Sequence, residues 1–539
     1  MDRREVLRLL TVPALLPARG PLAWAGVPGA GDTAVQVPDV ELALTAAPAE
    51  VAVLPGRPTR VWQYTASVVK GPASTVQALP GSYLGPVLRF RRGQKVRIRF
   101  RNRLDEPSIV HWHGLDVPEA ADGHPRLAVA AGQEYVYDFE VVNRAGTYWY
   151  HPHPHMRTGA QVYQGLAGLV LVSDPEEDAL GLPEGDAELF LVLQDRRFDD
   201  ANQFVYAGAR ATDTPPSGGM RGRGMGRMGG RGGGMGMGGM GGGMDAMMET
   251  MNGWLGDRVL VGGRPRPELR VDRRTYRLRL LNGSNARFYK LAWSDGTPFL
   301  VLGGDGGLLE RARSRRVLTL APGQRADVLL DLSGRPAGAT LALRSLEFPT
   351  AAVGRVGMMG ETAPLPQGAP LDLLTLTTSS TTGPRVTPPD RLSVPPPAWR
   401  AAPSAPVRRV PLTFMRMEWL IDGRTFEMDG VAPGERVAAG STHVWEFRNE
   451  PNPMGMAMAH PLHVHGTQFR VLSRTGAQDN PLAEGFNDTE ATDTVVVLPG
   501  ETVRVQLTFS RYPGLYLYHC HILEHEDMGM MRNFRITPA

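Results

Sequence analysis

One pattern occurs three times along the chain, and this repeat constrains the fold more than any other feature. In each copy an alternating hydrophobic strand ends in asparagine, and a glycine-containing turn later leads into another strand. The strands are residues 96–102, 276–282 and 443–449, and the turns are those at Gly132, Gly323 and Gly500. The copies are offset by 180 and 167 residues at the asparagines and by 191 and 177 at the glycines. These offsets predict three copies of one β-sandwich unit.

The length and composition agree with this organisation. A chain of 539 residues is too long to fold around one hydrophobic core, so several domains are expected. The 64 glycines and 46 prolines favour turns over long helices. We therefore expect an all-β protein with a first domain over 37–178, a second over 179–378 and a third over 407–539. Residues 379–406 are dense in serine, threonine and proline, which predicts an interdomain linker.

The N-terminal residues have the layout of a signal peptide. Arg3 and Arg4 precede a short apolar stretch that contains Pro13, and a small-residue site ends at Ala25. The stretch is too short to span a membrane, and no later window comes close, so no membrane span is expected. Residues 1–25 resemble a twin-arginine signal, although an ordinary basic signal remains an alternative. Either route predicts a periplasmic or extracellular protein.

The net charge gives no reason to expect a nucleic-acid partner, because the 58 basic residues are nearly balanced by 55 acidic ones and the net charge is only +3.

The second repeat contains an insert at residues 218–251 with an extreme composition. Residues 218–243 contain 16 glycines, and residues 220–251 contain ten of the 23 methionines. Such a segment cannot build a packed core, so we expect a mobile loop.

The 13 histidines fall into three windows, residues 111–124, 151–155 and 443–525. The middle repeat therefore has no imidazole to offer a metal, and a site between the first and third repeats is expected. Four His-x-His pairs stand out: His111 and His113, His151 and His153, His463 and His465, and His519 and His521. Residues i and i+2 of a strand share a face, so each pair can direct two imidazoles at one point. Eight such nitrogens exceed the needs of one ion and indicate several metals close together.

Cys520 is the only cysteine, which excludes an intramolecular disulfide and a four-cysteine zinc site. It lies between His519 and His521 and so faces the other side of their strand. There it can meet His460, His525 and Met530, and two imidazoles, a thiolate and a weak thioether are the ligand set of a blue-copper centre. An inert buried thiol is the alternative.

With these motifs, the sequence resembles the three-domain multicopper oxidases of the laccase and cuprous-oxidase, or copper-efflux-oxidase, type. The resemblance implies three cupredoxin-like Greek-key β-sandwich domains and four copper ions. It implies a type 1 site of His460, Cys520, His525 and axial Met530, a type 2 site of His111 and His463, and a type 3 pair held by His113, His151, His153, His465, His519 and His521. In the run 151–155 we prefer the first two histidines, because family ligands directly follow a strand like the one at 146–150. His124, His155 and His443 then have no metal role.

The resemblance also implies a reaction. Four single electrons enter at the type 1 copper, pass through Cys520 and its neighbouring histidines, and reduce dioxygen to two waters at the trinuclear cluster. Asp122 and Glu526 match family carboxylates that deliver protons. The alternative for both is a solvated loop acid.

The electron donor is the most open question. Thioethers bind Cu(I), and Met358, Met359, Met456 and Met458 are candidates for a substrate Cu(I) site beside the type 1 copper, with the insert gathering copper. This favours oxidation of Cu(I) with broad activity on phenols and aromatic amines, a role in copper tolerance, and a monomer. The alternatives are a laccase with the insert as a lid, a glycine-rich spacer with methionines as core filler, or a non-enzymatic copper-binding or cell-division scaffold.

Overall fold

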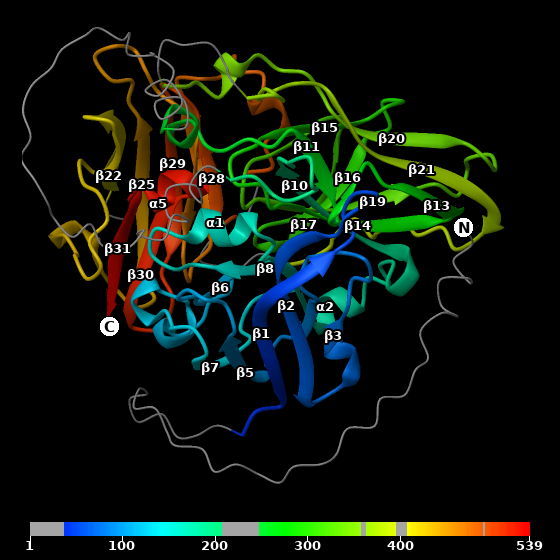
Figure 1. Cartoon of the computed structure of the whole chain (residues 1–539), viewed down its shortest axis with the longest axis horizontal. Helices are drawn as coiled ribbons and strands as arrows, with labels where there is room; N and C mark the ends of the chain where they lie inside the picture. The colour runs from blue at the N-terminus through cyan, green and yellow to red at the C-terminus, as the bar shows by residue number, and fades with distance from the viewer. Residues whose placement is uncertain (1–36, 207–246, 357–362, 395–406, 489–490) are drawn as a thin grey trace, which may run out of the picture. The chain divides into compact units, whose positions relative to one another are not determined.

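The computed structural model describes residues 37–206, 247–356, 363–394, 407–488 and 491–539, and their strands form six sheets (Figure 1). The chain is an all-β protein built from three cupredoxin-like Greek-key sandwiches, which confirms the predicted fold class. The predicted signal peptide lies outside the described residues. Within them, no helix is both long and apolar enough to cross a membrane.

The first sandwich packs a four-stranded sheet, in the order β2-β1-β5-β7, against a five-stranded sheet, in the order β3-β4-β9-β8-β6. Its core is a cluster of buried apolar side chains that includes Trp112 and Tyr150. The strands are β1 (Val40–Val51), β2 (Thr59–Lys70), β3 (Val76–Gln77), β4 (Val87–Arg91), β5 (Lys95–Asn102), β6 (Val110–His113), β7 (Glu134–Glu140), β8 (Gly146–Pro152) and β9 (Gly168–Ser173).

The second sandwich has a seven-stranded sheet, β12-β11-β10-β14-β19-β16-β17, and a five-stranded sheet, β13-β21-β20-β15-β18. A separate apolar cluster fills it. The strands are β10 (Glu188–Arg196), β11 (Arg258–Val261), β12 (Arg264–Pro265), β13 (Glu268–Arg273), β14 (Thr275–Asn282), β15 (Tyr289–Trp293), β16 (Phe299–Gly304), β17 (Gly307–Arg315), β18 (Leu318–Leu320), β19 (Arg325–Asp331), β20 (Thr340–Ser345) and β21 (Leu371–Thr382).

The third sandwich has two five-stranded sheets, β23-β22-β25-β29-β27 and β24-β31-β30-β26-β28. Its core contains Trp445 and also Cys520. The strands are β22 (Val407–Met415), β23 (Glu418–Ile421), β24 (Arg436–Ala438), β25 (Thr442–Asn449), β26 (His460–Val464), β27 (Phe469–Thr475), β28 (Thr494–Val497), β29 (Thr502–Thr508), β30 (Gly514–Cys520) and β31 (Met531–Thr537).

The repeated asparagine and glycine form equivalent hydrogen bonds in each sandwich. The strands β5, β14 and β25 end at the three asparagines, and the side-chain amide of each donates to two backbone carbonyls of its own sandwich. The backbone N–H of each turn glycine, Gly132, Gly323 and Gly500, donates to the carbonyl of its asparagine. The repeat seen in the sequence is thus a hydrogen-bonded link between one strand end and one turn, because these buried backbone groups need partners.

Helices are few and short. The described residues include α1 (Thr158–Tyr163), α2 (Pro175–Asp178), a helical stretch at 247–251 and α5 (Leu523–Asp527), with 3₁₀ turns at Ala73–Thr75, Glu119–Ala121, Pro125–Leu127, Gly185–Ala187, Thr350–Ala352, Pro433–Glu435 and Ala483–Gly485. Figure 1 shows α1 beside α5, and Asp527 in α5 accepts the backbone N–H groups of Thr158 and Gly159 at 2.8 Å each. This contact joins the first sandwich to the third next to the histidine-bearing strands.

Two segments differ from expectation. β21 continues to Thr382, and Leu392 and Ser393 bond to the backbone of β17, so part of the predicted linker packs on the second sandwich. Residues 247–251, the end of the predicted loop insert, are helical, and Met251 is buried in the third core. Residues 207–246 lie outside the described part, and the domain limits stay predictions.

Candidate metal centre

Four strands bring the His-x-His pairs to one place, and the second histidine of three pairs lies directly after the strand end: His153, His465 and His521. In the first sandwich β6 pairs with β8, which sets His111 opposite His151. In the third, β26 pairs with β30, which sets His463 opposite His519. All four side chains are fully buried. The two sandwiches therefore face each other through histidines, as the distribution along the sequence predicted.

The imidazoles converge in overlapping groups whose potential ligand atoms lie within 4.8 Å of one another. The groups are His111, His113 and His151; His111, His463 and His465; and His153, His465 and His519. His521 belongs to none of them, but its ring centroid lies 5.0 Å from that of His113 and 5.5 Å from that of His151. All eight histidines predicted for the multi-metal site are thus brought together.

The direction of the ring nitrogens tests whether a cation fits. Nδ1 of His111 lies 2.6 Å from the Asp122 carbonyl, and Nδ1 of His463 lies 2.8 Å from the Asp493 carbonyl. A carbonyl only accepts, so both Nδ1 atoms carry the proton and both Nε2 atoms are lone pairs. These two Nε2 atoms face each other at 3.4 Å. Two lone pairs at this distance repel unless a cation lies between them, and the donor set therefore fits a metal.

Burial keeps these imidazoles in the form that binds metals. It lowers the pKa of His151 to about 3 and that of His153 to about 4, and neighbouring imidazoles add to the effect at His111 and His465. These four rings are therefore neutral at physiological pH, and no proton has to leave before they ligate.

Cys520 forms a second group on the other face of β30. Its Sγ lies 3.4 Å from Nδ1 of His460 and 3.6 Å from Nδ1 of His525, and all three residues are buried. Met530 is also buried, and its carbonyl accepts the backbone N–H of Cys520 at 3.0 Å. Burial raises the pKa of the Cys520 thiol, so a bound cation would have to displace its proton.

Two further groups hold the imidazoles of this second site. The indole of Trp419 packs against His460 and His525, with ring centroids 4.7 and 4.8 Å apart. Nε2 of His525 donates to the Met251 carbonyl at 3.0 Å, and the Trp419 indole N–H donates to the same oxygen at 3.1 Å. A ligand histidine that donates its second ring N–H to a carbonyl is oriented by that bond.

The two candidate acids lie on different sides of the histidine cluster. Oδ2 of Asp122 accepts from Nδ1 of His465 at 2.8 Å, while Glu526 lies 3.4 Å from Nε2 of His153 and 3.2 Å from Nδ1 of His519. Gly123 (φ 84°) permits this loop geometry, because a Cβ there would lie 2.3 Å from the Val110 carbonyl oxygen. Both acids are buried and neither is a solvated loop residue.

Comparison with known proteins agrees with this geometry. Two sequence profiles, both described as multicopper oxidase, match residues 60–177 and 401–539. The multicopper oxidase mco of Staphylococcus haemolyticus is 30% identical over 85% of this chain and 83% of its own length. The chain belongs to the multicopper oxidase family.

Other members of the family are similar over nearly the whole chain. A laccase of Bacillus stratosphericus is 28% identical over 88% of this chain and 90% of its own. The crystal structure of the McoA multicopper oxidase from the hyperthermophile Aquifex aeolicus superposes with a TM-score of 0.72 and 31% identity, covering 93% of this chain and 97% of McoA. This multicopper oxidase is accordingly an oxidoreductase that carries out copper-dependent oxidation with oxygen as the acceptor.

The remaining histidines of this multicopper oxidase belong to none of the candidate metal groups found among the described residues. His124 bonds to the side chain of Asn533 at 2.9 Å. His155 is exposed, and its ring lies 5.4 Å from Phe426. His443 in β25 packs against Phe509.

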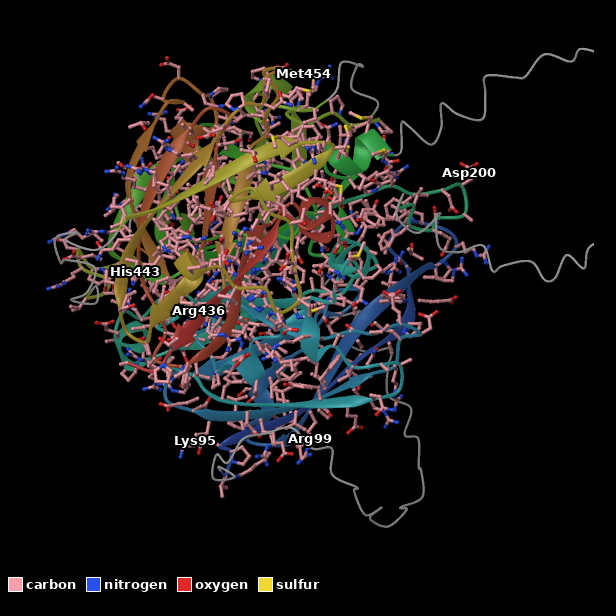
Figure 2. All side chains as sticks on the ribbon, turned by 90° about the vertical axis from the view of Figure 1, so that its left-hand side faces the viewer. Lys95, Arg99, Asp200, Arg436, His443 and Met454 are labelled. Carbon is pink, nitrogen blue, oxygen red and sulfur yellow. The ribbon has the colours of Figure 1, made fainter. Side chains whose placement is uncertain are left out.

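The methionine candidates have different surroundings. Met358 and Met359 lie outside the described residues. Met458 is 4% exposed and Met456 packs against the same core, whereas Met454 is 76% exposed at the outer surface (Figure 2).

Sequence reasoning missed Asp493 and Arg325, two buried residues at the edge of the histidine cluster. Oδ1 of Asp493 lies 3.1 Å from Nε2 of His113, and both Asp493 oxygens accept from Arg325 at 2.7 and 2.5 Å. Although burial acts in the opposite direction, the Arg325 guanidinium holds the pKa of Asp493 well below its ordinary value. Arg325 belongs to the second sandwich, which has no histidine and drew no attention as part of the site.

Proposed function

We propose that this multicopper oxidase holds four copper ions, one at His460, Cys520, His525 and Met530 and three among the eight paired histidines. The opposed lone pairs of His111 and His463 support this assignment most strongly, because that arrangement is unfavourable without a cation. Bound copper supplies the redox chemistry, in which single electrons are taken from the substrate at the mononuclear site and four of them reduce dioxygen to two water molecules at the trinuclear site.

The protein contributes the connection between the sites. His519 precedes and His521 follows Cys520, the last residue of β30, so the bonded atoms of three consecutive residues link the thiol to the histidine cluster. The histidine cluster is buried, which keeps bulk water from the reacting oxygen.

For the substrate we propose Cu(I), with broader activity on phenols and aromatic amines. Three segments meet beside His460 and His525, and each contains a methionine or precedes one in the sequence. The segment that ends at Val356 pairs with the one containing Met458, since Ala459 donates to the Val353 carbonyl at 2.7 Å. Asn252 joins Val356 to the end of the insert through bonds of 3.1 and 2.8 Å. Met358 and Met359 follow Val356 in the sequence, and with Met456 and Met458 they remain our candidates for binding one soft cation.

The basic N-terminal segment supports export to the periplasm or the cell exterior, and Cu(I) oxidation there supports a role in copper tolerance, by a monomeric enzyme. The second candidate is a laccase that acts mainly on phenols with the insert as a lid. It is favoured by the Met251 carbonyl, which ties the end of the insert to His525.

Removal of residues 218–246 separates these two functions. This deletion keeps Met251, which anchors His525 and Trp419, so the mononuclear site should remain intact. We expect kcat/KM for Cu(I) to fall about tenfold, equivalent to about 1.4 kcal/mol of lost binding, and that for a phenol to stay the same or rise. Steady-state oxygen consumption with each donor measures both.

A length-matched control replaces the seven methionines between residues 220 and 244 with leucine. Loss of Cu(I) turnover in this variant identifies the thioethers as the cause. Unchanged Cu(I) turnover in both variants would contradict the copper-gathering role, and loss of phenol turnover instead would favour the lid. A purified wild-type protein without about four copper ions or a blue colour would contradict the whole assignment.

A further inference from the structure

The three equivalent turns of the repeat differ in what surrounds them. A Cβ added at Gly132 or Gly500 would meet nothing within 4 Å, whereas at Gly323 it would lie 2.9 Å from Cδ2 of His521. Two residues after the glycine stand Glu134, Arg325 and Thr502, of which only Arg325 is buried. The turn of the second sandwich therefore reaches the histidine cluster, while its two counterparts lie at the surface.

Arg325 uses every N–H of its guanidinium. Nη1 and Nη2 form the fork on Asp493, Nη1 also donates to the Gly323 carbonyl at 3.0 Å, and Nη2 to the Asp305 carbonyl at 2.9 Å. Nε donates to the Thr147 carbonyl at 3.2 Å, which lies in β8 four residues before His151. The guanidinium of Arg325 thus joins the second sandwich to β8 of the first, which carries His151, and to Asp493 of the third.

Asp493 in turn contacts two histidines through different atoms. Its backbone carbonyl accepts from Nδ1 of His463, and its Oδ1 faces Nε2 of His113. With Nε2 of His113 donating to this oxygen, Nδ1 of His113 keeps its lone pair, and this buried atom has no hydrogen-bond partner among the described residues. Each contact determines which nitrogen of the ring is left for a metal.

We propose that Arg325 is a positioning residue for the trinuclear copper site, which it acts on through Asp493 although its own sandwich contributes no ligand. The bidentate fork fixes the Asp493 carboxylate, and that carboxylate holds His113 while its backbone holds His463. The proposal rests on the proposed function, because it requires that the histidine cluster binds copper.

A matched control is available in the same sandwich. Arg277 is also buried, and it donates to Asp327 at 2.6 Å and to Glu177 at 2.5 Å, but no hydrogen bond or ion pair joins it to a histidine within the described residues. Replacement of either arginine by methionine removes a buried ion pair at a junction between sandwiches. Only replacement of Arg325 is expected to change copper binding.

The experiment measures copper per chain and the EPR spectrum of wild type, Arg325→Met, Arg325→Lys, Asp493→Asn and Arg277→Met. We expect Arg325→Met and Asp493→Asn to bind the trinuclear copper about 10- to 100-fold more weakly while the blue mononuclear signal remains. Arg325→Lys should recover part of the copper, and Arg277→Met should lower the melting temperature with full copper content.

Asp493→Asn still tests the proposal if Arg325→Met does not fold. Asparagine has the same shape as aspartate, and Arg325 keeps its hydrogen bonds to three backbone carbonyls and its ion pair with Asp305. Full copper content and an unchanged EPR spectrum in Asp493→Asn, or equal copper loss in Arg277→Met, would overturn the proposal. Failure of the proposed function looks different, since wild type itself would then lack copper.

Discussion

Replacement of Cys520 by serine is expected to give a folded, colourless protein whose oxygen consumption falls at least about 10⁴-fold, as when one member of a catalytic unit is removed. Serine is nearly isosteric with cysteine, so the buried site between His460 and His525 stays filled. The hydroxyl is a hard group that does not ionise at neutral pH and is a poor ligand for copper. The substitution also removes the sulfur from the connection between the two candidate sites.

The measurements are visible absorbance, copper per chain and oxygen consumption. We expect about one copper fewer than in wild type, with the trinuclear copper retained. A suitable control is Tyr518→Phe, which removes a buried hydroxyl two residues earlier on the same strand, where it bonds to Glu435 and Arg408 at 2.9 Å each. That variant should stay blue and active. A Cys520→Ser protein that keeps the blue band or the turnover would contradict the assignment of Cys520.

The convergence of the candidate ligands was predictable because strand geometry is local. A His-x-His pair shares a face whatever the rest of the chain does, and the residue between them faces the other way, so His519, Cys520 and His521 already indicated two sites on one strand. The repeated asparagine and glycine likewise depend on a hydrogen bond inside each sandwich. In the structure, β5, β14 and β25 end at the three asparagines, as predicted.

The groups that orient the candidate ligands were not predictable, because their contacts join residues far apart in the sequence. Arg325 and Asp493 are 168 residues apart in sequence, and His525 and the Met251 carbonyl are 274 apart. These contacts depend on how the sandwiches pack together, and a backbone carbonyl carries no side-chain signal. The composition of the insert predicted that it would build no core of its own, and it gave no sign that Met251 would enter the core of the third sandwich.

The second large effect is expected at the two acids, whose environments push their pKa values apart. Burial, and then the nearby Glu119 and Asp116, raise the pKa of Asp122 well above its ordinary value, which favours its protonated form. Although burial acts in the opposite direction, interaction with His153 and His519 lowers the pKa of Glu526, so it is ionised. Two carboxyl groups whose pKa values are shifted in opposite directions beside the same cluster suit a donor and an acceptor for protons.

Asp122→Asn and Glu526→Gln are therefore each expected to lower the turnover of dioxygen about 100-fold, because an amide neither releases nor accepts the proton. Copper content and blue colour should stay at the wild-type level, which separates loss of proton transfer from loss of the metal. Glu435→Gln is the control, since Glu435 is equally buried in the third sandwich but pairs with Arg532 at 2.9 Å. It should lower the melting temperature and leave turnover unchanged. Wild-type turnover in both acid variants would mean that protons reach the site by another path, and loss of copper in either would assign that residue to orienting the histidine beside it.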